Sequence, residues 1–238
     1  MKRAIAVTLT MLMIFTLGCK RQHPSMINID PEFDPGNIRT ILVIPAMSNI
    51  TKGDDPNRES EVMVDKVIWT FVSERGDYSF ISPNSFRGTV GRAGITDQMS
   101  EFIDSWMNHK VLKEEFKQAI TMLNPDVILI PEVYLWNKDE ADYRESATSS
   151  VTQVGITMSM VDPRSGRILW QATDENFKES VRTEGERVQA SSGGIDRRVA
   201  GKTASGKDMY AAPPFDDVAV LVIESLVTAI PEKVVTGK

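Results

Sequence analysis

The residues Val151 to Trp170, VTQVGITMSMVDPRSGRILW, carry the clearest structural signal in this chain. In the first half, large apolar residues alternate with residues that are mostly small or polar, which is the period of a β-strand with one buried face. The segment Asp162 to Gly166 then has turn chemistry, because proline presets a turn backbone and glycine accepts a positive φ. Ile168 to Trp170 resumes the apolar pattern. The stretch therefore predicts a β-hairpin.

Apolar patterns on both sides of this hairpin predict a mixed order of helices and strands. Two nearly continuous apolar runs, Ile38 to Met47 and Asp126 to Leu135, suit strands that are buried on both faces. Tyr78 to Ile81 is a brief third strand. Four stretches with apolar residues on a helical period predict helices, namely Arg58 to Glu74, Thr96 to Met107, Val111 to Leu123 and Phe215 to Ile230. This order predicts an α/β fold, a mixed-sheet α/β sandwich with helices packed on its faces.

Polar or glycine-rich segments separate these elements and predict loops. Phe86 to Gly94 is punctuated by glycine, and Asn137 to Ser149 is polar and charged. The longest segment, Thr173 to Ala212, is mostly polar, and its part at about 179–212 is predicted to be a mobile loop on an edge of the domain. Loops of this length in compact domains are usually either functional or disordered.

The N-terminal residues Met1 to Lys20, MKRAIAVTLTMLMIFTLGCK, have the form of an export signal. Lys2 and Arg3 precede an uncharged apolar run that is too short for a membrane-spanning helix, which needs roughly 20 residues. A small residue comes directly before Cys19, the single cysteine of the chain. This resembles the lipobox of bacterial lipoproteins, in which the chain is cut before the cysteine and the thiol is acylated. The alternative is an ordinary secretory signal.

These patterns divide the chain into four parts. Residues 1–18 are the predicted signal peptide, and residues 19–37 are the lipidated cysteine with a flexible tether. Residues 38–231 are the predicted α/β domain, and residues 232–238 are a C-terminal tail. A tether that ends at residue 37 spans at most about 60 Å when fully extended. The domain is therefore expected to stay close to the membrane that holds the lipid.

Composition and charge exclude several kinds of partner. The chain has 238 residues and a formal net charge of −6, and removal of Lys2 and Arg3 with the signal peptide leaves −8. A negative protein is a poor partner for phosphate backbones or anionic lipid surfaces, so nucleic-acid binding is not expected. One cysteine allows no intrachain disulfide and no zinc-finger cluster.

The motifs yield no catalytic, metal-binding or cofactor-binding set. Gly201 to Lys207 has the G-x-x-x-x-G-K spacing of a phosphate loop, but Asp208 stands where a Ser or Thr should hold magnesium. A flexible basic loop is the preferred interpretation. His23 and His109 are the only histidines, which does not support a catalytic triad or a multi-histidine metal site. We therefore expect no catalytic residue, no metal and no cofactor.

Two features are candidates for contact with a protein partner. Trp136 stands at a predicted strand end beside polar residues, where an aromatic ring could bind a partner. The long loop is basic within an acidic protein and could order on a partner's acidic surface, although a disordered linker is the plainer interpretation. Its candidate contact residues are Arg187, Arg197, Arg198, Lys202 and Lys207.

Three local motifs resemble the lipoprotein domains related to the curli-secretion protein CsgG, the penicillin-binding-protein activator LpoB and the N-terminal domain of TolB. They are Ile44 to Asn49, IPAMSN; Asn124 to Ile130, NPDVILI; and Val161 to Trp170, VDPRSGRILW, which is close to the family's Val-Asp-x-x-Thr-Gly-x-x-x-Trp hairpin. The resemblance covers about residues 38–231 in the same order. It implies a fold like that of CsgG and the TolB N-terminal domain and a cell-envelope setting, and it implies no catalytic residue.

These features together predict a lipid-anchored, non-enzymatic cell-envelope lipoprotein that acts as a periplasmic protein-interaction or assembly module. Lys20 follows the cysteine in place of the Asp that, in the lipoprotein families this resembles, favours inner-membrane retention. The periplasmic face of the outer membrane is therefore the expected location. The alternative is a homo-oligomeric structural subunit of a secretion or envelope complex. A nucleotide-binding or hydrolytic enzyme is the least favoured interpretation.

Overall fold

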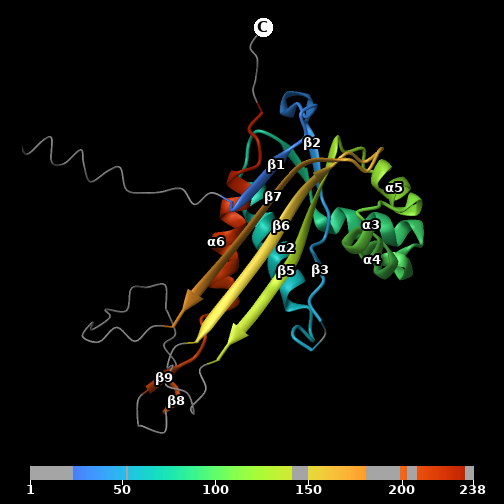
Figure 1. Ribbon diagram of the computed structural model, residues 1–238. Helices are drawn as coiled ribbons and strands as arrows, with labels where there is room; N and C mark the ends of the chain where they lie inside the picture. Colours follow the sequence, from blue (N-terminus) through green and yellow to red (C-terminus); the bar gives the residue numbers. More distant parts are fainter. Residues whose placement is uncertain (1–23, 52, 141–149, 181–198, 203–207, 234–238) are drawn as a thin grey trace, which may run out of the picture.

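The computed structural model describes residues 24–51, 53–140, 150–180, 199–202 and 208–233 (Figure 1). These residues form a seven-stranded mixed sheet with the order β1-β7-β6-β5-β2-β4, in which β3 also pairs with β5, and a two-stranded sheet of β8 and β9. The strands are β1 (Met26–Ile29), β2 (Thr40–Val43), β3 (Met47–Ser48), β4 (Ser79–Ile81), β5 (Val127–Asp139), β6 (Val151–Val161), β7 (Ile168–Glu179), β8 (Val199–Lys202) and β9 (Asp208–Tyr210). The helices are α2 (Glu59–Ser73), α3 (Pro83–Ala93), α4 (Met99–His109), α5 (Glu114–Thr121) and α6 (Phe215–Thr228), with short 3-10 turns at Pro35–Asn37 and Thr96–Gln98. The predicted α/β class is confirmed.

The hairpin of β6 and β7 is the element that the sequence predicted most clearly, and it is present. The two strands pair antiparallel over their whole length. At the turn, Gly166 has a φ of 75° and its amide donates to the carbonyl oxygen of Asp162 at 2.9 Å. The Asp162 carboxylate also accepts from the Ser165 hydroxyl at 2.6 Å. The turn is therefore held by its own residues.

β2 and β5 form the centre of the sheet. They pair in parallel, with Ile41 beside Val127. β4 pairs in parallel with the other side of β2, whereas β6 pairs antiparallel with β5. Asp126 fixes the start of this central pair of strands. Its carboxylate accepts hydrogen bonds from the backbone amides of Arg39 and Thr40, at the start of β2, at 2.8 and 2.9 Å.

Helices cover both faces of this centre and create two cores (Figure 1). α2 and α6 pack on one face, and α3, α4 and α5 pack on the other. Side chains of successive residues along β2 and just after it point alternately into one core and the other. Ile41 and Val43 face α2 and α6, whereas Leu42 and Ile44 face the other three helices. This explains why the segment is apolar without alternation, as the sequence predicted.

Residues 26–29, which the sequence placed in the flexible tether, form the edge strand β1. β1 pairs antiparallel with β7, with Met26 opposite Thr173. The Ser25 hydroxyl donates to the Thr173 carbonyl oxygen at 2.8 Å, and the Ser25 amide donates to Asp174 at 3.2 Å. A four-residue strand is too short to show a period in sequence, and its partner strand lies almost 150 positions away. Sequence patterns therefore could not reveal it.

Phe86 to Gly94, predicted as a glycine-rich loop, lies mostly in α3. Ser82 caps the start of this helix with its side chain, and Gly94 ends it with a φ of 71°. Gly88 and Gly91 lie on the exposed side. The opposite side, which includes Phe86, is buried against the sheet. Caps and burial thus outweigh the low helix propensity of glycine at this position.

The long polar segment after the hairpin also contains strands. The first residues of this segment, Thr173 to Glu179, belong to β7. Further along the segment, β8 and β9 pair antiparallel. Residues 181–198 and 203–207 lie outside the described part of the chain, so the mobility predicted for about 179–212 stays a prediction. β5 likewise extends into a predicted loop, as far as Asp139.

A buried carboxylate joins α4 to the centre of the sheet. Glu132 of β5 is 6% exposed and accepts a hydrogen bond from the indole Nε1 of Trp106 at 2.9 Å. It also pairs with the ammonium of Lys110, which follows α4 in a left-handed backbone conformation. Trp106 is completely buried, so its indole N–H depends on this carboxylate, whereas Lys110 is partly exposed to solvent.

We expect Glu132→Ala to lower the free energy of unfolding by about 2 kcal/mol, because it leaves the buried Trp106 N–H without an acceptor. Chemical denaturation of the full chain measures the change. Lys113→Ala, which removes an exposed ion pair with Glu101, is the matched control and should leave the stability unchanged within error. Equal stability of Glu132→Ala and the unaltered chain would contradict a holding role for this carboxylate.

Candidate functional site

Most residues that the sequence selected for function lie outside the described part of the chain. These are Cys19, Arg187, Arg197, Arg198 and Lys207. Lys202 is the last residue of β8, which pairs with β9. Lipidation and partner contact at these positions therefore stay predictions.

Trp136, the remaining candidate for a partner contact, is a core residue. It is 4% exposed and stacks on Phe215 at the start of α6, with 4.2 Å between the ring centroids and 13° between the ring planes. The ammonium of Lys138 lies 4.7 Å from the centroid of the Phe215 ring. The structure thus contradicts a surface role for Trp136, because β5 continues past it and α6 covers its indole.

Two adjoining hollows between α2, α3 and α4 offer a first candidate site. One, of about 470 Å³, lies between α2 and the start of α3, and the other, of about 290 Å³, extends toward α4. Arg87 lines both hollows. Its guanidinium pairs with Asp65 of α2, and Glu61, one helical turn earlier, pairs with Arg58 at 2.6 Å. Two ion pairs therefore lie beside these hollows, one between α2 and α3 and one at the start of α2.

The two acids of α2 have altered proton affinities. Burial raises the pKa of Asp65 despite its hydrogen bonds, and burial likewise raises the pKa of Glu61. A carboxyl with a raised pKa beside a cavity is one mark of a general acid or base. Both oxygens of Asp65 are already engaged, however, one by the Ala46 amide at 2.6 Å and the other by Arg87. Asp65 therefore ties the segment after β2 to α2 and α3.

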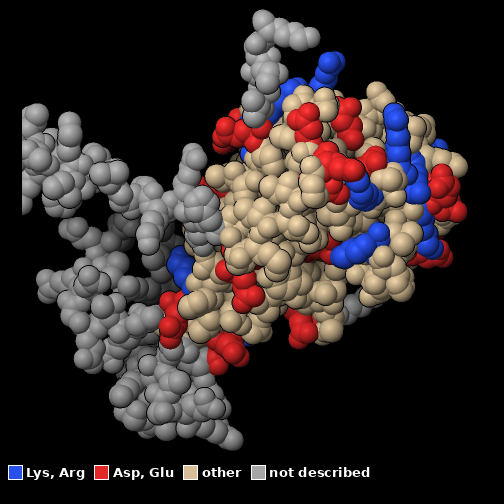
Figure 2. Space-filling view, turned by 45° about the horizontal axis from the view of Figure 1, so that its top comes forward, with Lys and Arg blue, Asp and Glu red and all other residues tan. Residues whose placement is uncertain are grey.

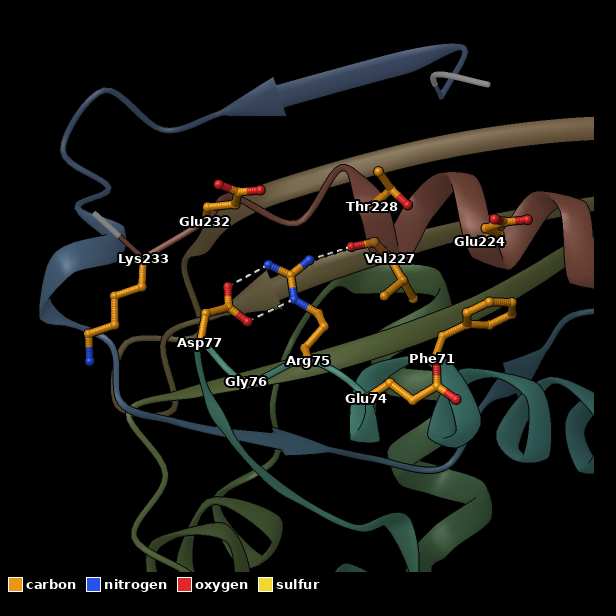
Figure 3. A pocket seen from close by; sticks show the side chains of 10 residues that line it. All are labelled: Phe71, Glu74, Arg75, Gly76, Asp77, Glu224, Val227, Thr228, Glu232 and Lys233. Carbon is orange, nitrogen blue, oxygen red and sulfur yellow. Dashed lines mark hydrogen bonds and ion pairs between the residues drawn. The ribbon is translucent and has the colours of Figure 1, made fainter. Parts of the chain in front are cut away.

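A third cavity, of about 570 Å³, lies where the end of α2 meets the C-terminal end of α6 (Figure 3). Arg75 extends into it from the turn after α2 and donates to both carboxylate oxygens of Asp77, at 3.0 and 2.5 Å. The same guanidinium donates to the carbonyl oxygen of Val227 at 2.7 Å and to that of Ile230 at 3.3 Å.

This arrangement holds a helix end. The last carbonyl oxygens of a helix lack intrahelical donors. Arg75 donates hydrogen bonds to carbonyl oxygens at and just beyond the end of α6, and all three of its guanidinium nitrogens are engaged. Although burial opposes the effect, the hydrogen bonds and the positive charge of Arg75 hold the pKa of Asp77 below its usual value. The other charged residues that line the cavity are Glu74, Glu224, Glu232 and Lys233. The third cavity is therefore a joint between α2 and α6.

Other candidates from the sequence carry no site in the described residues. There, no group of three or more His, Cys, Asp or Glu side chains could hold a metal ion. Nor is any helix of that part long and apolar enough to cross a membrane. His109 ends α4 and is exposed. The phosphate-loop spacing begins at Gly201 in β8, and the strand β9 follows it at Asp208. That motif requires a helix after the loop.

The sequence did not single out Asp65, Arg75 or Glu132. Arg87 lies 22 positions from Asp65, and Trp106 lies 26 positions from Glu132. Arg75 has Asp77 two positions away, but its contact on α6, Val227, lies 152 positions away. No local spacing reveals these long-range contacts. The one available signal was Glu132 itself, because an acid in an apolar strand that is buried on both faces needs a partner.

No family model and no curated protein matches this sequence. The chain is similar to the lipoprotein GNA1162 from Neisseria meningitidis, at 17% identity and a TM-score of 0.41 over 62% of this chain and 88% of that one. It is similar to a PelC dodecamer structure from Paraburkholderia phytofirmans, at 12% identity and a TM-score of 0.40 over 87% of this chain and 97% of that one. It is also similar to the LpoB C-terminal domain from Salmonella enterica, at 9% identity and a TM-score of 0.33 over 61% of this chain and 86% of that one. Structural neighbours thus include bacterial lipoproteins, but TM-scores this low carry no argument about function.

The ion pair in the third cavity predicts a pH-dependent contribution to stability. The pKa of Asp77 is lower in the folded chain than in the unfolded chain, so its contribution is complete above the unfolded value of about 3.9 and is lost as the pH falls through the lower folded pKa. Asp77→Asn should therefore be less stable than the unaltered chain at neutral pH, and the difference should shrink below about pH 4.

Denaturant unfolding at several pH values measures this difference. Lys233→Ala, which removes another charge beside the same cavity, is the control and should not reproduce the acid-dependent change. A stability difference for Asp77→Asn that stays constant down to acid pH would contradict the role assigned to the Arg75–Asp77 pair.

Proposed function

We propose that this chain is a lipid-anchored, non-enzymatic lipoprotein of the cell envelope, whose α/β domain serves as a protein-interaction or assembly module. The observation that carries the proposal is the short distance in sequence between Cys19 and the sheet. Ser25 hydrogen-bonds to β7 only six positions after the single cysteine, which ends an apolar segment of the export type. Acylation of that thiol would hold the folded domain directly at the membrane surface.

The state of three acids that join elements of the fold supports a binding module over an enzyme. Asp65, Asp77 and Glu132 each pair with a cation. A general acid or base must reach a proton of the substrate, whereas these carboxylates are occupied in joining helices to one another or to the sheet. Their arrangement favours a rigid body that presents its surface to a partner.

The chain fits the lipoprotein domains related to CsgG, LpoB and the N-terminal domain of TolB in its Val161 to Trp170 motif and in its order of elements. That resemblance implies an envelope setting. Lys20 after Cys19 favours the periplasmic face of the outer membrane. The acidic charge of the chain fits a partner other than nucleic acid.

A homo-oligomeric subunit of an envelope complex is the second candidate, and β1 is the observation that favours it. β1 is an edge strand without a charged residue, and all four of its residues are exposed. Uncharged exposed edges can pair with further strands. The molar mass of the detergent-solubilised full chain, measured by light scattering, separates a monomeric module from such a subunit.

Cys19→Ser should abolish lipid labelling and move the protein from the membrane fraction to the soluble fraction. The physical reason is that acyl chains supply the apolar area that holds the chain in the bilayer. Metabolic labelling with a fatty acid, followed by fractionation, measures both effects. Gln22→Ser, three positions later, is the control and should retain label and location. A Cys19→Ser protein that keeps its label in the membrane fraction would refute the anchor.

A photo-crosslinker placed at Lys202 should give a discrete product with one envelope protein in living cells. Replacing Arg187, Arg197 and Arg198 by serine should reduce this product several-fold, because fewer cations remain to meet an acidic partner surface. The control position is Met122, which is exposed at the end of α5. The same products from both positions, or yields unaffected by the serine changes, would contradict recruitment through this segment.

A further inference from the structure

Exposed apolar side chains gather at one edge of the described sheet. Eight large apolar residues are exposed in the described part, and four of them lie on β1 and β7. These four, Met26, Ile27, Ile29 and Phe177, are called the apolar edge below. The other four are Val62, Val111, Met122 and Leu221. An exposed apolar cluster of this kind marks a surface that something else covers.

The strand register places members of the apolar edge on both sides of the sheet. Met26 is opposite Thr173 and therefore points to the same side as Thr173 and Phe177. The four-residue step from Thr173 to Phe177 along β7 corresponds to about 14 Å. Ile27 and Ile29 point to the other side of β1. The apolar edge therefore presents Met26 and Phe177 on one side of the sheet border and Ile27 and Ile29 on the other.

The chain enters the fold at this edge. Ser25, directly before β1, is hydrogen-bonded to β7, and Cys19 lies six positions earlier. Six extended residues reach at most about 20 Å, whereas a domain of this size is about 40 Å across. A lipid on Cys19 would therefore prevent the domain from turning its far side to the bilayer, and it would keep the border that carries β1 within about 20 Å of the membrane.

The charges around the apolar edge are consistent with this placement. β1 has no charged residue. After β1, Asp30 and Glu32 both pair with Arg167, at 3.4 and 2.5 Å. Glu175, between Thr173 and Phe177, lies 3.5 Å from the Tyr134 hydroxyl and thus leans across β6, away from β1. Figure 2 shows an uncharged area in the middle of its view, with acidic and basic side chains toward the margins.

We infer that the apolar edge docks on the bilayer surface, with Met26 and Phe177 entering the interfacial layer. The inference rests on the proposed lipid anchor at Cys19. A second copy that paired with β1 edge to edge would extend the sheet and leave Phe177, about 14 Å along β7, uncovered. A bilayer is a surface broad enough to cover Met26 and Phe177 at once. The proposed lipid on Cys19 would hold every copy of the protein close to that surface.

Tryptophan substitutions with brominated lipid test this docking. The full lipidated chain is reconstituted in vesicles of phosphatidylethanolamine with a minor fraction of phosphatidylglycerol, with or without bromine on the acyl chains. Phe177→Trp and Met26→Trp should lose most of the emission that the new indole adds, because bromine quenches indoles in contact with the bilayer. Met122→Trp is the matched control, since Met122, Phe177 and Met26 are 66%, 63% and 62% exposed. It should lose none.

Flotation with the same vesicles tests the anchor separately, and Cys19→Ser should not float. If the unaltered chain does not float, the anchor and the docking both fail. If it floats but Phe177→Trp and Met26→Trp are quenched no more than Met122→Trp, the anchor stands and the docking is wrong. A blue-shifted emission without quenching by brominated lipid would show that protein covers the edge, and it would also overturn the docking.

Discussion

The burial of both faces of β2 and β5 is the constraint on which the rest of this structure depends. Neighbouring residues of these strands enter opposite cores, so helices must cover the sheet on two sides. α2 and α6 cover one side, and α3, α4 and α5 cover the other. The antiparallel strands β6, β7 and β1 extend this centre to one border, and there the sheet meets the N-terminal segment.

Charged pairs fasten the helices to this framework. Glu132 connects the centre of the sheet with α4, Asp65 connects α2 with α3, and Arg75 connects the end of α2 with the end of α6. Two of these pairs, Asp65–Arg87 and Arg75–Asp77, line hollows, a position that resembles an active site. Because their polar atoms are satisfied by one another or by the backbone, these groups provide rigidity. A rigid body with occupied polar groups suits a protein that presents surfaces.

β1 shortens the connection between the sheet and the proposed lipid anchor at Cys19. The sequence suggested a flexible tether up to residue 37, which allows considerable freedom of orientation. The sheet begins at residue 26, so only a few residues separate it from Cys19. A short connection limits orientation as well as distance, because the domain is wider than the connection is long. With the proposed lipid on Cys19, the border of the sheet that carries β1 would be the part of the domain nearest the membrane.

The sequence by itself determined the hairpin of β6 and β7, the doubly buried central strands and four of the helices, because local period and turn chemistry encode them. Only the tertiary structure decided the rest. β1 forms because β7 offers it a free edge, α3 forms because its caps and buried side outweigh its glycines, and Trp136 is buried because Phe215 stacks on it. The partners in these contacts, those of Asp65 and Glu132, and the α6 carbonyl oxygen that Arg75 binds are distant in sequence, so no local pattern specifies them.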